Sequence, residues 1–304
     1  MTKKHLLKLA DWSCEEIEQT LNLADELKKQ QKAGISHPLL AGKTLGMIFQ
    51  KASTRTRVSF EVGMYQLGGS ALFLGSNDLQ IGRGEPVEDT ARVLSRYLDG
   101  IMIRTYAQEE VEALAEYGSV PVINGLTDYA HPCQVLADLQ TIREYKGGLG
   151  GLKACFIGDG NNMANSLIVG CIKMGMQFHI ACPKEYQPDA GIMRWAAEQG
   201  KFSCVENPLE AAEGADVLFT DVWASMGQEG EAAKRQAAFS GYQINEKLLS
   251  AAKPDAMVQH CLPAHREEEI TAAVFEAHAG EIFDEAENRL HAQKAVLAQL
   301  LGGV

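Results

Sequence analysis

A run of hydroxyl and guanidinium side chains stands directly before a segment with helical spacing. Its members are Ser53, Thr54, Arg55, Thr56 and Arg57, with Lys51 two residues earlier. A helix N-terminus presents backbone N–H groups and the positive end of the helix dipole, so these donors would converge where an anion is already favoured. A helix cap followed by solvated arginines is the alternative. The density of donors, in a chain of formal net charge −12, favours a phosphate-sized anion.

Three further polar residues of the first half have the chemistry to handle a carbonyl group. Arg104 directly follows an apolar run, and His131 and Gln134 lie about one helical turn apart. Side chains at that spacing can face one small ligand, one polarising a carbonyl and the other accepting from an amide. The alternatives are an interdomain salt bridge for Arg104, and a helix cap or a satisfied core histidine for His131.

Asp221 and Cys261 each follow an apolar run in the second half. A carboxylate there could pair with a substrate amine, and a thiol could accept a hydrogen bond or a proton. The alternatives are a helix cap for Asp221 and a small buried apolar residue for Cys261. His260 beside Cys261 suggests a thiol nucleophile, but adjacent strand residues point to opposite faces of a sheet. We therefore expect no covalent cysteine catalysis.

The segment Gly158–Asn162 resembles a dinucleotide-binding fingerprint but fails its requirements. Met163 stands where the third glycine would fall, and the next strand ends without the acidic residue that would hold a ribose. We therefore expect no NAD. The two asparagines of this segment would either bind a polar substrate or shape the turn.

The elements that must position these residues alternate between apolar β-rich runs and helical segments. The expected strands are 44–49, 71–74, 101–103 and 120–123 in the first half, and 154–157, 178–181, 217–220 and 256–259 in the second. This alternation predicts an α/β protein with two doubly wound domains, each built on a central parallel sheet. The polar clusters follow the strands, and ligands of open α/β sheets bind beyond the carboxyl ends of strands. We expect an active site in the interdomain cleft.

The helical segments are marked by their apolar stripes and their ends. One carries Val58, Val62 and Tyr65 on one stripe and stops at Gly68-Gly69. A second begins at Pro86, a favourable first helical position, and turns Ala91, Leu94 and Leu98 inward. Others are expected over 166–174 and 285–301.

Four glycines in the five residues 147–151 predict the domain boundary, because glycine in such density disfavours both helix and strand. We expect one domain over 1–146 and another over 147–284. The C-terminal helix, about 285–304, is expected to pack back on the first domain.

Composition excludes several classes of protein. With 46% hydrophobic and 22% charged residues the chain is ordinary for a globular protein. No apolar run is long enough to cross a bilayer and the start lacks a signal peptide, so we expect no membrane association and a cytoplasmic location. Seven cysteines without a Cys-x-x-Cys pair indicate free thiols and no metal site. The acidic charge balance argues against nucleic-acid binding.

Taken together, the motifs resemble the aspartate/ornithine carbamoyltransferase family, and its ornithine members in particular. The resemblance covers nearly the whole chain and rests on 53–57, 80–86, 131–134, 221–227, 260–263 and 287–291. Gln50 stands where the family often has Glu, and Glu267 where Gly often follows the arginine. Neither departure falls on an expected contact residue.

The resemblance implies transfer of a carbamoyl group from carbamoyl phosphate to the side-chain amine of L-ornithine, giving citrulline and phosphate. It assigns phosphate contacts to Ser53, Thr54, Arg55 and Thr56, with Gln80 donated by a neighbouring subunit. Arg104, His131 and Gln134 would hold the carbamoyl carbonyl and amide. Arg289 would contact the same ligand. Asn162, Asp221, Ser225 and Met226 would bind ornithine, and Cys261 and Leu262 would line the point of reaction.

The resemblance also implies a homotrimer or an assembly of trimers, a cis bond before Pro263, and no metal or organic cofactor. The expected mechanism is direct attack by the neutral amine, with Arg104 and His131 stabilising the charge on the carbonyl oxygen. Two alternatives remain open: a sister carbamoyltransferase acting on aspartate, putrescine or acetylornithine, and a non-catalytic anion-binding module.

Overall fold

The computed structural model of the chain describes residues 4–76, 79–225, 227 and 229–303. The chain forms two compact units, the first made of Met1–Ala137 with Asn288–Val304, the second of Asp138–Glu287. The division falls within helix α5 (Pro132–Lys146), and the glycine run 147–151 follows that helix directly. Across the described residues, no helix is long and apolar enough to span a membrane.

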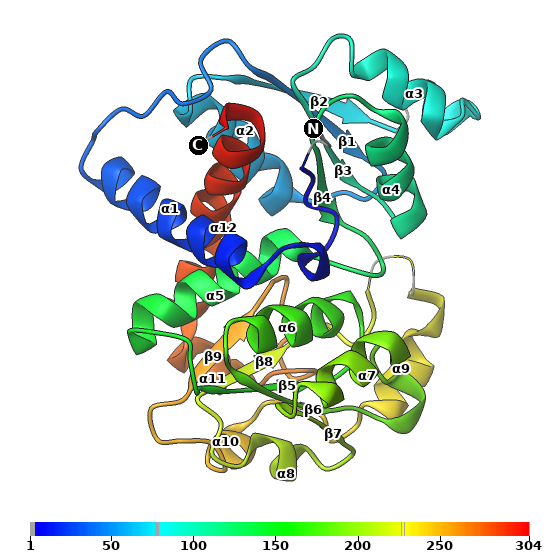
Figure 1. Ribbon diagram of the computed structural model, residues 1–304. Coiled ribbons are helices and arrows are strands. Elements are labelled where there is room, and N and C mark those ends of the chain that lie inside the picture. The colour runs from blue at the N-terminus through cyan, green and yellow to red at the C-terminus, as the bar shows by residue number, and fades with distance from the viewer. Residues whose placement is uncertain (1–3, 77–78, 226, 228, 304) are drawn as a thin grey trace. The chain divides into compact units, whose positions relative to one another are not determined.

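The first unit is built on a four-stranded parallel sheet of order β2-β1-β3-β4 (Figure 1). Its strands are β1 (Thr44–Phe49), β2 (Ser70–Gly75), β3 (Gly100–Arg104) and β4 (Val122–Leu126). All four predicted strands are present. The last begins at Val122 rather than at Val120, since Pro121 between them has no N–H to donate to a ladder.

Helices cover both faces of this sheet (Figure 1). They are α1 (Cys14–Lys32), α2 (Thr54–Gln66), α3 (Val87–Leu94), α4 (Gln108–Tyr117) and α12 (Ala279–Leu297), with short 3₁₀ turns at η1 (Leu9–Asp11) and η2 (Gln80–Arg83). α3 and α4 share one core with β1, β3 and β4, and this core contains the predicted inward residues Ala91 and Leu98. Pro86 precedes the first residue of α3 instead of opening the helix.

The predicted apolar stripe of α2 was wrong. Val58 and Tyr65 are 51% and 81% exposed, whereas Phe60 and Met64 are fully buried. The reason lies in α12, which approaches so closely that a Cβ on Gly63 would lie 3.3 Å from the Lys294 side chain. Gly63 therefore belongs to the buried face, although it adds no apolar side chain to the sequence pattern.

Lys294 itself is fully buried, where its Nζ donates to His37 Nε2 at 3.0 Å and to Gln66 Oε1 at 2.9 Å. Burial lowers the pKa of this ammonium group to about 8. The C-terminal helix continues from Leu297 into a π turn, η5 (Ala298–Gly302). It begins at Ala279, earlier than the expected position 285, and its residues from Asn288 onward belong to the first unit.

The second unit is built on a five-stranded parallel sheet of order β7-β6-β5-β8-β9. Its strands are β5 (Lys153–Ile157), β6 (Gln177–Ala181), β7 (Phe202–Val205), β8 (Val217–Thr220) and β9 (Met257–His260). Four of these were predicted, and β7 was missed. β7 is a half-buried edge strand of four residues with a serine in it, so it lacks the continuous apolar run of the other strands.

The remaining helices belong to the second unit. They are α6 (Asn162–Lys173), α7 (Ala190–Glu198), α8 (Pro208–Ala212), α9 (Ala232–Ala238), α10 (Glu246–Leu249) and α11 (Ala272–Ala277), with 3₁₀ turns η3 (Lys184–Tyr186) and η4 (Glu229–Glu231). Figure 1 shows α6 and α7 on one side of the sheet and α8 and α10 on the other. The predicted fold class, two domains with central parallel sheets, is confirmed.

The strand order of each sheet contains one point where the chain changes direction across the sheet. In the first unit it lies between β1 and β3, and in the second between β5 and β8. Ligands of open α/β sheets bind outside the carboxyl ends of the strands at this switch point. Ser53 lies beyond the end of β1, and Arg104 is the last residue of β3. Asn161 and Asp221 lie beyond the ends of β5 and β8.

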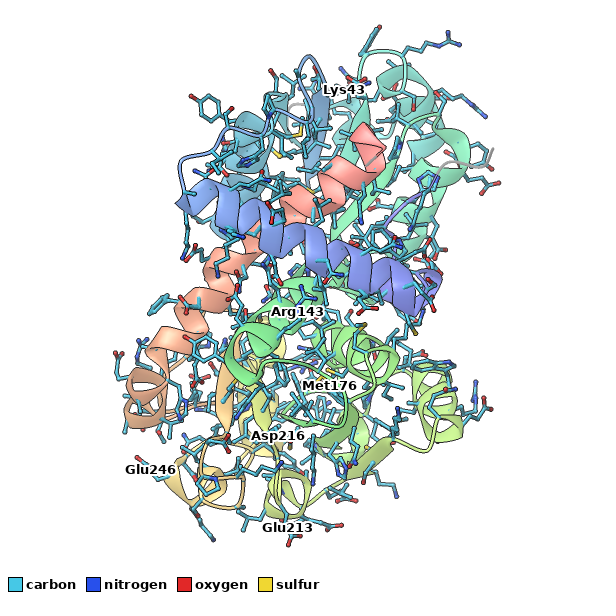
Figure 2. All side chains as sticks on the ribbon, turned by 60° about the vertical axis from the view of Figure 1, so that its left-hand side comes forward. Lys43, Arg143, Met176, Glu213, Asp216 and Glu246 are labelled. Carbon is cyan, nitrogen blue, oxygen red and sulfur yellow. The ribbon has the colours of Figure 1, made fainter. Side chains whose placement is uncertain are left out.

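The opposite, amino ends of these strands are fastened by ion pairs. Lys43, directly before β1, binds Asp99 at 2.9 Å, and Asp216, directly before β8, binds Lys253 at 2.7 Å. Figure 2 labels Lys43 and Asp216. Asp216 also accepts from the Lys153 backbone N–H at 2.9 Å, which joins β8 to the start of β5. Each sheet thus has one structural end and one end that carries the candidate site residues.

Candidate active site

The predicted anion loop caps helix α2. Ser53 is its N-cap, and the Ser53 hydroxyl accepts from the Thr56 backbone N–H at 3.1 Å. Thr54 is exposed, Arg55 is half-buried and Thr56 is fully buried. The capping interpretation is therefore correct for Ser53. It does not exclude anion binding, because a helix of thirteen residues has further N–H groups and a positive dipole end in its first turn.

Arg289 brings the C-terminal helix to this loop. Its guanidinium donates to Gln134 Oε1 at 2.7 Å, to Thr56 Oγ1 at 3.2 Å and to Gln293 Oε1 at 3.0 Å. Gln293 in turn donates to Ser59 on α2 at 2.7 Å. Three residues that the resemblance assigned to one ligand are thus joined directly, although Arg289 and Gln134 are 155 positions apart in the chain.

His131 lies within the electrostatic reach of three arginines. Burial is the main cause that lowers the pKa of its imidazole well below the usual value, followed by the positive charges of Arg289, Arg104 and Arg55. His131 is 4% exposed and Arg104 8%. At neutral pH the imidazole is therefore uncharged, so it can donate one hydrogen bond to a carbonyl oxygen without competing with the arginines for an anion.

The first unit therefore concentrates positive charge at its switch point. Three guanidinium groups converge around a neutral histidine in a chain of net charge −12. Such an arrangement attracts a dianion, and it places hydrogen-bond donors where a carbonyl oxygen could gain negative charge.

Gln80 occupies a different position. It is exposed on the 3₁₀ turn η2, which follows the edge strand β2. Its backbone carbonyl accepts from the Glu85 N–H at 3.1 Å, which closes the turn. Gln80 is thus an exposed residue of the turn between β2 and α3.

In the second unit, Asp221 is the centre of a buried hydrogen-bond network. Its Oδ2 accepts from Asn161 Nδ2 at 2.9 Å, and its Oδ1 accepts from the Val222 N–H at 2.8 Å and from the Cys261 thiol at 3.2 Å. Asp221 is 8% exposed. The network joins the loops that follow β5, β8 and β9, so it forms only when the three strands are side by side.

The Cys261 thiol is protonated at physiological pH. Burial is the largest cause that raises its pKa well above the usual value, and the neighbouring Asp221 carboxylate adds to the effect. A thiolate nucleophile is therefore disfavoured at this position. The neighbouring His260 does not activate it, because the His260 ring is engaged elsewhere.

His260 stabilises the loop that carries Cys261. Its Nδ1 accepts from the Leu262 N–H at 2.9 Å, so its Nε2 carries the proton and donates to Glu269 at 3.1 Å. The backbone N–H of His260 donates to Glu285 at 2.9 Å. The bond between Leu262 and Pro263 is cis, as the resemblance implied, and Leu262 has a φ of 60°, in the left-handed region.

The remaining predicted acceptor-site residues are placed unequally. Asn162 is buried in the first turn of α6, next to the N-cap Asn161. Ser225 is half-buried beyond β8. Met226 lies outside the described residues. Asn161 donates from its Nδ2 to Asp221 Oδ2 at 2.9 Å.

Two further features of this half concern the loop after β5, where the sequence predicted that the asparagines either shape the turn or bind a polar substrate. Asn161 accepts from the Met163 and Ala164 N–H groups while its amide reaches Asp221, so it shapes the turn and binds the carboxylate at once. Asp159 forms a buried ion pair with Arg235 at 2.7 Å. The glycine-rich spacing around Asp159 signalled a special turn, but no local pattern points to Arg235.

One group of described side chains has the composition of a cation site. His265, Glu268 and Glu269 place one potential ligand atom each within 4.8 Å of one another. Glu269 Oε1 is already bound by the His260 ring and by the His265 N–H at 2.6 Å. This carboxylate therefore serves the loop after β9.

Comparison with known families matches each half of the chain to a domain of one family. The model of the carbamoyl-P binding domain of aspartate/ornithine carbamoyltransferases matches residues 4–144, and the model of the Asp/Orn binding domain matches 150–300. The chain belongs to the aspartate/ornithine carbamoyltransferase family.

Several similar members of that family are named ornithine carbamoyltransferase. The ornithine carbamoyltransferase of Syntrophotalea carbinolica is 59% identical, over 98% of this chain and 99% of the relative, and that of Thermococcus kodakarensis is 53% identical over 99% and 97%. Among solved structures, the ornithine carbamoyltransferase of Pyrococcus furiosus has a TM-score of 0.95 at 53% identity, covering 100% and 98% of the two chains. The anabolic enzyme of Campylobacter jejuni has a TM-score of 0.93 at 46% identity, covering 98% of each.

Proposed function

We propose that this protein is an ornithine carbamoyltransferase, which transfers the carbamoyl group of carbamoyl phosphate to the side-chain amine of L-ornithine to give L-citrulline and phosphate. One observation carries the proposal beyond family membership: the switch points of the two sheets carry complementary charge. The first unit offers three guanidinium groups, suited to a phosphate, and the second offers the buried Asp221 carboxylate, suited to an amino acid's ammonium group.

In the first unit, the phosphate of carbamoyl phosphate binds Ser53, Thr54, Arg55 and Thr56 at the start of α2. Arg104, His131 and Gln134 bind the carbamoyl carbonyl and amide, and Arg289 contacts the same ligand. The support is their convergence: Arg289 already joins Gln134 to Thr56, and Arg104 and Arg55 act on His131. As the amine attacks, charge builds on the carbonyl oxygen, where the Arg104 and His131 donors stabilise it.

In the second unit, Asp221 binds the ornithine ammonium group, and Asn162, Ser225 and Met226 contact the amino-acid end. Cys261 and Leu262 line the point of reaction. The protonated state of the Cys261 thiol supports direct attack by the neutral amine without a covalent enzyme intermediate. The phosphate then leaves as an anion that the guanidinium groups already bind.

We further propose that the carbamoyl phosphate-binding domain spans 1–146 together with the helix of about 285–304, and that 147–284 form the ornithine-binding domain. Two features support this division. The family models match 4–144 and 150–300, on either side of the glycine run, and the residues from Asn288 onward group with the first compact unit.

A homotrimer, or an assembly of trimers, is the proposed oligomeric state, with Gln80 completing a neighbour's site. The outer surface of the first unit supports it. Val58 on α2 and Leu72 and Phe73 on the edge strand β2 are 51%, 48% and 41% exposed, so several apolar side chains are exposed along this edge of the sheet. A free β-strand edge with apolar side chains favours burial against another chain.

Mixing experiments test the shared site. Arg55→Ala subunits and Gln80→Ala subunits are each expected to be inactive. If Gln80 acts across an interface, subunits exchanged between the two preparations recover activity, because some interfaces then carry both intact residues. Mixed assemblies that stay as inactive as their parents would refute it.

The cytoplasm is the proposed location. All seven cysteines are free thiols, among them the neighbouring pair Cys182 and Cys204, and free thiols suit a reducing compartment.

A steady-state assay tests the activity itself. Purified protein with carbamoyl phosphate and L-ornithine is expected to form citrulline and phosphate in equal amounts. Aspartate, putrescine and acetylornithine in place of ornithine test the sister activities, and ornithine is expected to give the highest kcat/KM. Binding of phosphate or carbamoyl phosphate without citrulline formation would instead indicate a non-catalytic anion-binding module.

A further inference from the structure

We propose that Arg235 and Asp159 are positioning residues for the acceptor amino acid: their buried ion pair fixes the segment after β8, which carries Asp221 and Ser225. The inference rests on the proposed function and adds a specificity-determining pair to it. Neither residue was singled out for the reaction by the sequence motifs, and both lie at the switch point of the second unit's sheet.

The geometry shows one side chain joining three segments. Arg235 extends from α9, and its Nη1 donates to Asp159 Oδ2 at 2.7 Å and to the Trp223 carbonyl oxygen at 3.0 Å. Asp159 belongs to the loop after β5, and Trp223 lies two residues beyond Asp221 in the loop after β8. Arg235 and Asp159 are each 6% exposed, so solvent screens the pair weakly.

An aromatic cluster packs around the guanidinium and the segment that it binds. The Arg235 guanidinium lies 5.0 Å from the centre of the Tyr186 ring. The buried Phe239, one helical turn after Arg235, packs against Tyr186 at 4.8 Å and against Trp223 at 6.1 Å between ring centres. The Trp223 segment is thus held by its backbone and by its side chain at the same place.

The turn that presents Asp159 is equally constrained. Gly160 donates its N–H to the Tyr186 carbonyl at 2.8 Å, and a Cβ at Gly160 would lie 2.2 Å from the Pro188 nitrogen. Glycine is therefore required for this close approach, which brings the loop after β5 against the η3 turn. Asp159 and Asn161, on either side of Gly160, then reach Arg235 and Asp221 respectively.

The pair also keeps the charge of Asp221 available. Asp159 and Asp221 are close enough for the Asp221 charge to raise the pKa of Asp159, which burial raises most, to about 6. Arg235 opposes this shift and balances the Asp159 charge. Three neutral groups donate to Asp221, namely a side-chain amide, a backbone N–H and a thiol, and none of these three neutralises its charge. Asp221 is therefore left to attract a substrate ammonium group.

Steady-state kinetics of Arg235→Met test the inference. We expect the KM for ornithine to rise tenfold or more, while the KM for carbamoyl phosphate, whose proposed site is in the other unit, stays within twofold of the wild type. Arg235→Lys keeps the charge but not the planar pair of donors, so it should restore part of the affinity. Asp159→Asn should raise the ornithine KM at least threefold, because Arg235 loses its buried charged partner and keeps only the exposed Glu231, 3.5 Å from its Nε.

Lys234→Met is the matched control. Lys234 is the exposed neighbour of Arg235 on the same helix, so this variant removes one positive charge from α9 without touching the ion pair. Its ornithine KM should stay within twofold of the wild type. Circular dichroism and gel filtration at the assay temperature establish that each variant is folded. If Arg235→Met does not fold, the ornithine KM values of Arg235→Lys and Asp159→Asn test the proposal instead.

The possible outcomes separate the two proposals. A wild-type protein that forms no citrulline refutes the proposed function. The positioning role is overturned if the wild type is active and folded Arg235→Met changes the ornithine KM less than threefold. The same holds for Arg235→Lys and Asp159→Asn where they replace Arg235→Met. Equal losses of affinity for both substrates would also overturn it, because they would indicate a general structural defect.

Discussion

Replacing Asp221 by Asn removes one charge from the acceptor half-site while keeping the size of the side chain. Both Asp221 oxygens accept hydrogen bonds, Oδ2 from Asn161 and Oδ1 from Val222 and Cys261. An asparagine has one oxygen and one NH₂ group, so either orientation of its amide sets a donor against a donor. The variant therefore loses the charge offered to ornithine and also gains a local conflict in the fold.

The two effects have separable magnitudes. A hydrogen bond to a charged group contributes about 1.5 to 3 kcal/mol, which corresponds to a loss of about 10- to 160-fold in kcat/KM for ornithine. A buried donor left without an acceptor costs about 1 to 3 kcal/mol, which should appear in the free energy of unfolding. Initial rates of citrulline formation at varied ornithine measure the first effect, and denaturant unfolding measures the second.

Asp216→Asn is the matched control for this variant. Asp216 lies at the other end of β8, is 5% exposed, and likewise accepts with both oxygens, from the Lys153 N–H and from the Lys253 ammonium group. The same donor conflict should therefore lower its stability, while its ornithine kinetics stay unchanged. If Asp221→Asn retained ornithine kcat/KM within threefold of the wild type, or if Asp216→Asn lost as much, the assignment of Asp221 to ornithine would be refuted.

Three further predictions concern the other half-site, the thiol and the C-terminal helix. Arg289→Lys keeps the charge but cannot donate to both Gln134 and Thr56 as the guanidinium does, so the KM for carbamoyl phosphate should rise at least tenfold. An unchanged KM for carbamoyl phosphate in the citrulline assay would remove Arg289 from the site. Cys261→Ser should keep measurable turnover because the thiol is protonated and no covalent step uses it; an inactive folded variant, together with an S-carbamoyl adduct (a thiocarbamate) trapped on the wild type and seen by mass spectrometry, would contradict direct transfer. Burial lowers the pKa of Lys294 from 10.5 to about 8, so the wild type pays a folding penalty below pH 8 that disappears as the pH rises toward 10.5. Relative to Lys294→Met, its free energy of unfolding should therefore increase by about 3 kcal/mol over that interval in denaturant titrations, and parallel pH profiles would refute the buried charge.

The sequence alone determined the fold class and most strands, because buried parallel strands are continuous apolar runs separated by helices. It was wrong where packing overrides the pattern. The stripe of Val58 and Tyr65 looked like a buried face of α2, yet the buried face contains Gly63, where α12 approaches. Edge strand β7 was missed because its exposure on one side permits polar residues.

The sequence also determined which residue types could do chemistry. Ser53 to Arg57 form a local cluster of hydrogen-bond donors, and predicting an anion site there requires only that a helix follows the cluster. Which distant residues complete each half-site was decided by the tertiary structure. Arg289 meets Gln134 because α12 crosses to the first unit, and Asp221 meets Asn161 and Cys261 because β5, β8 and β9 are neighbours in the second sheet. The order of parallel strands is set by crossovers and long-range packing, which leave no periodic signal in the residues themselves, so the two switch points and the Asp159–Arg235 pair become visible only in the folded chain.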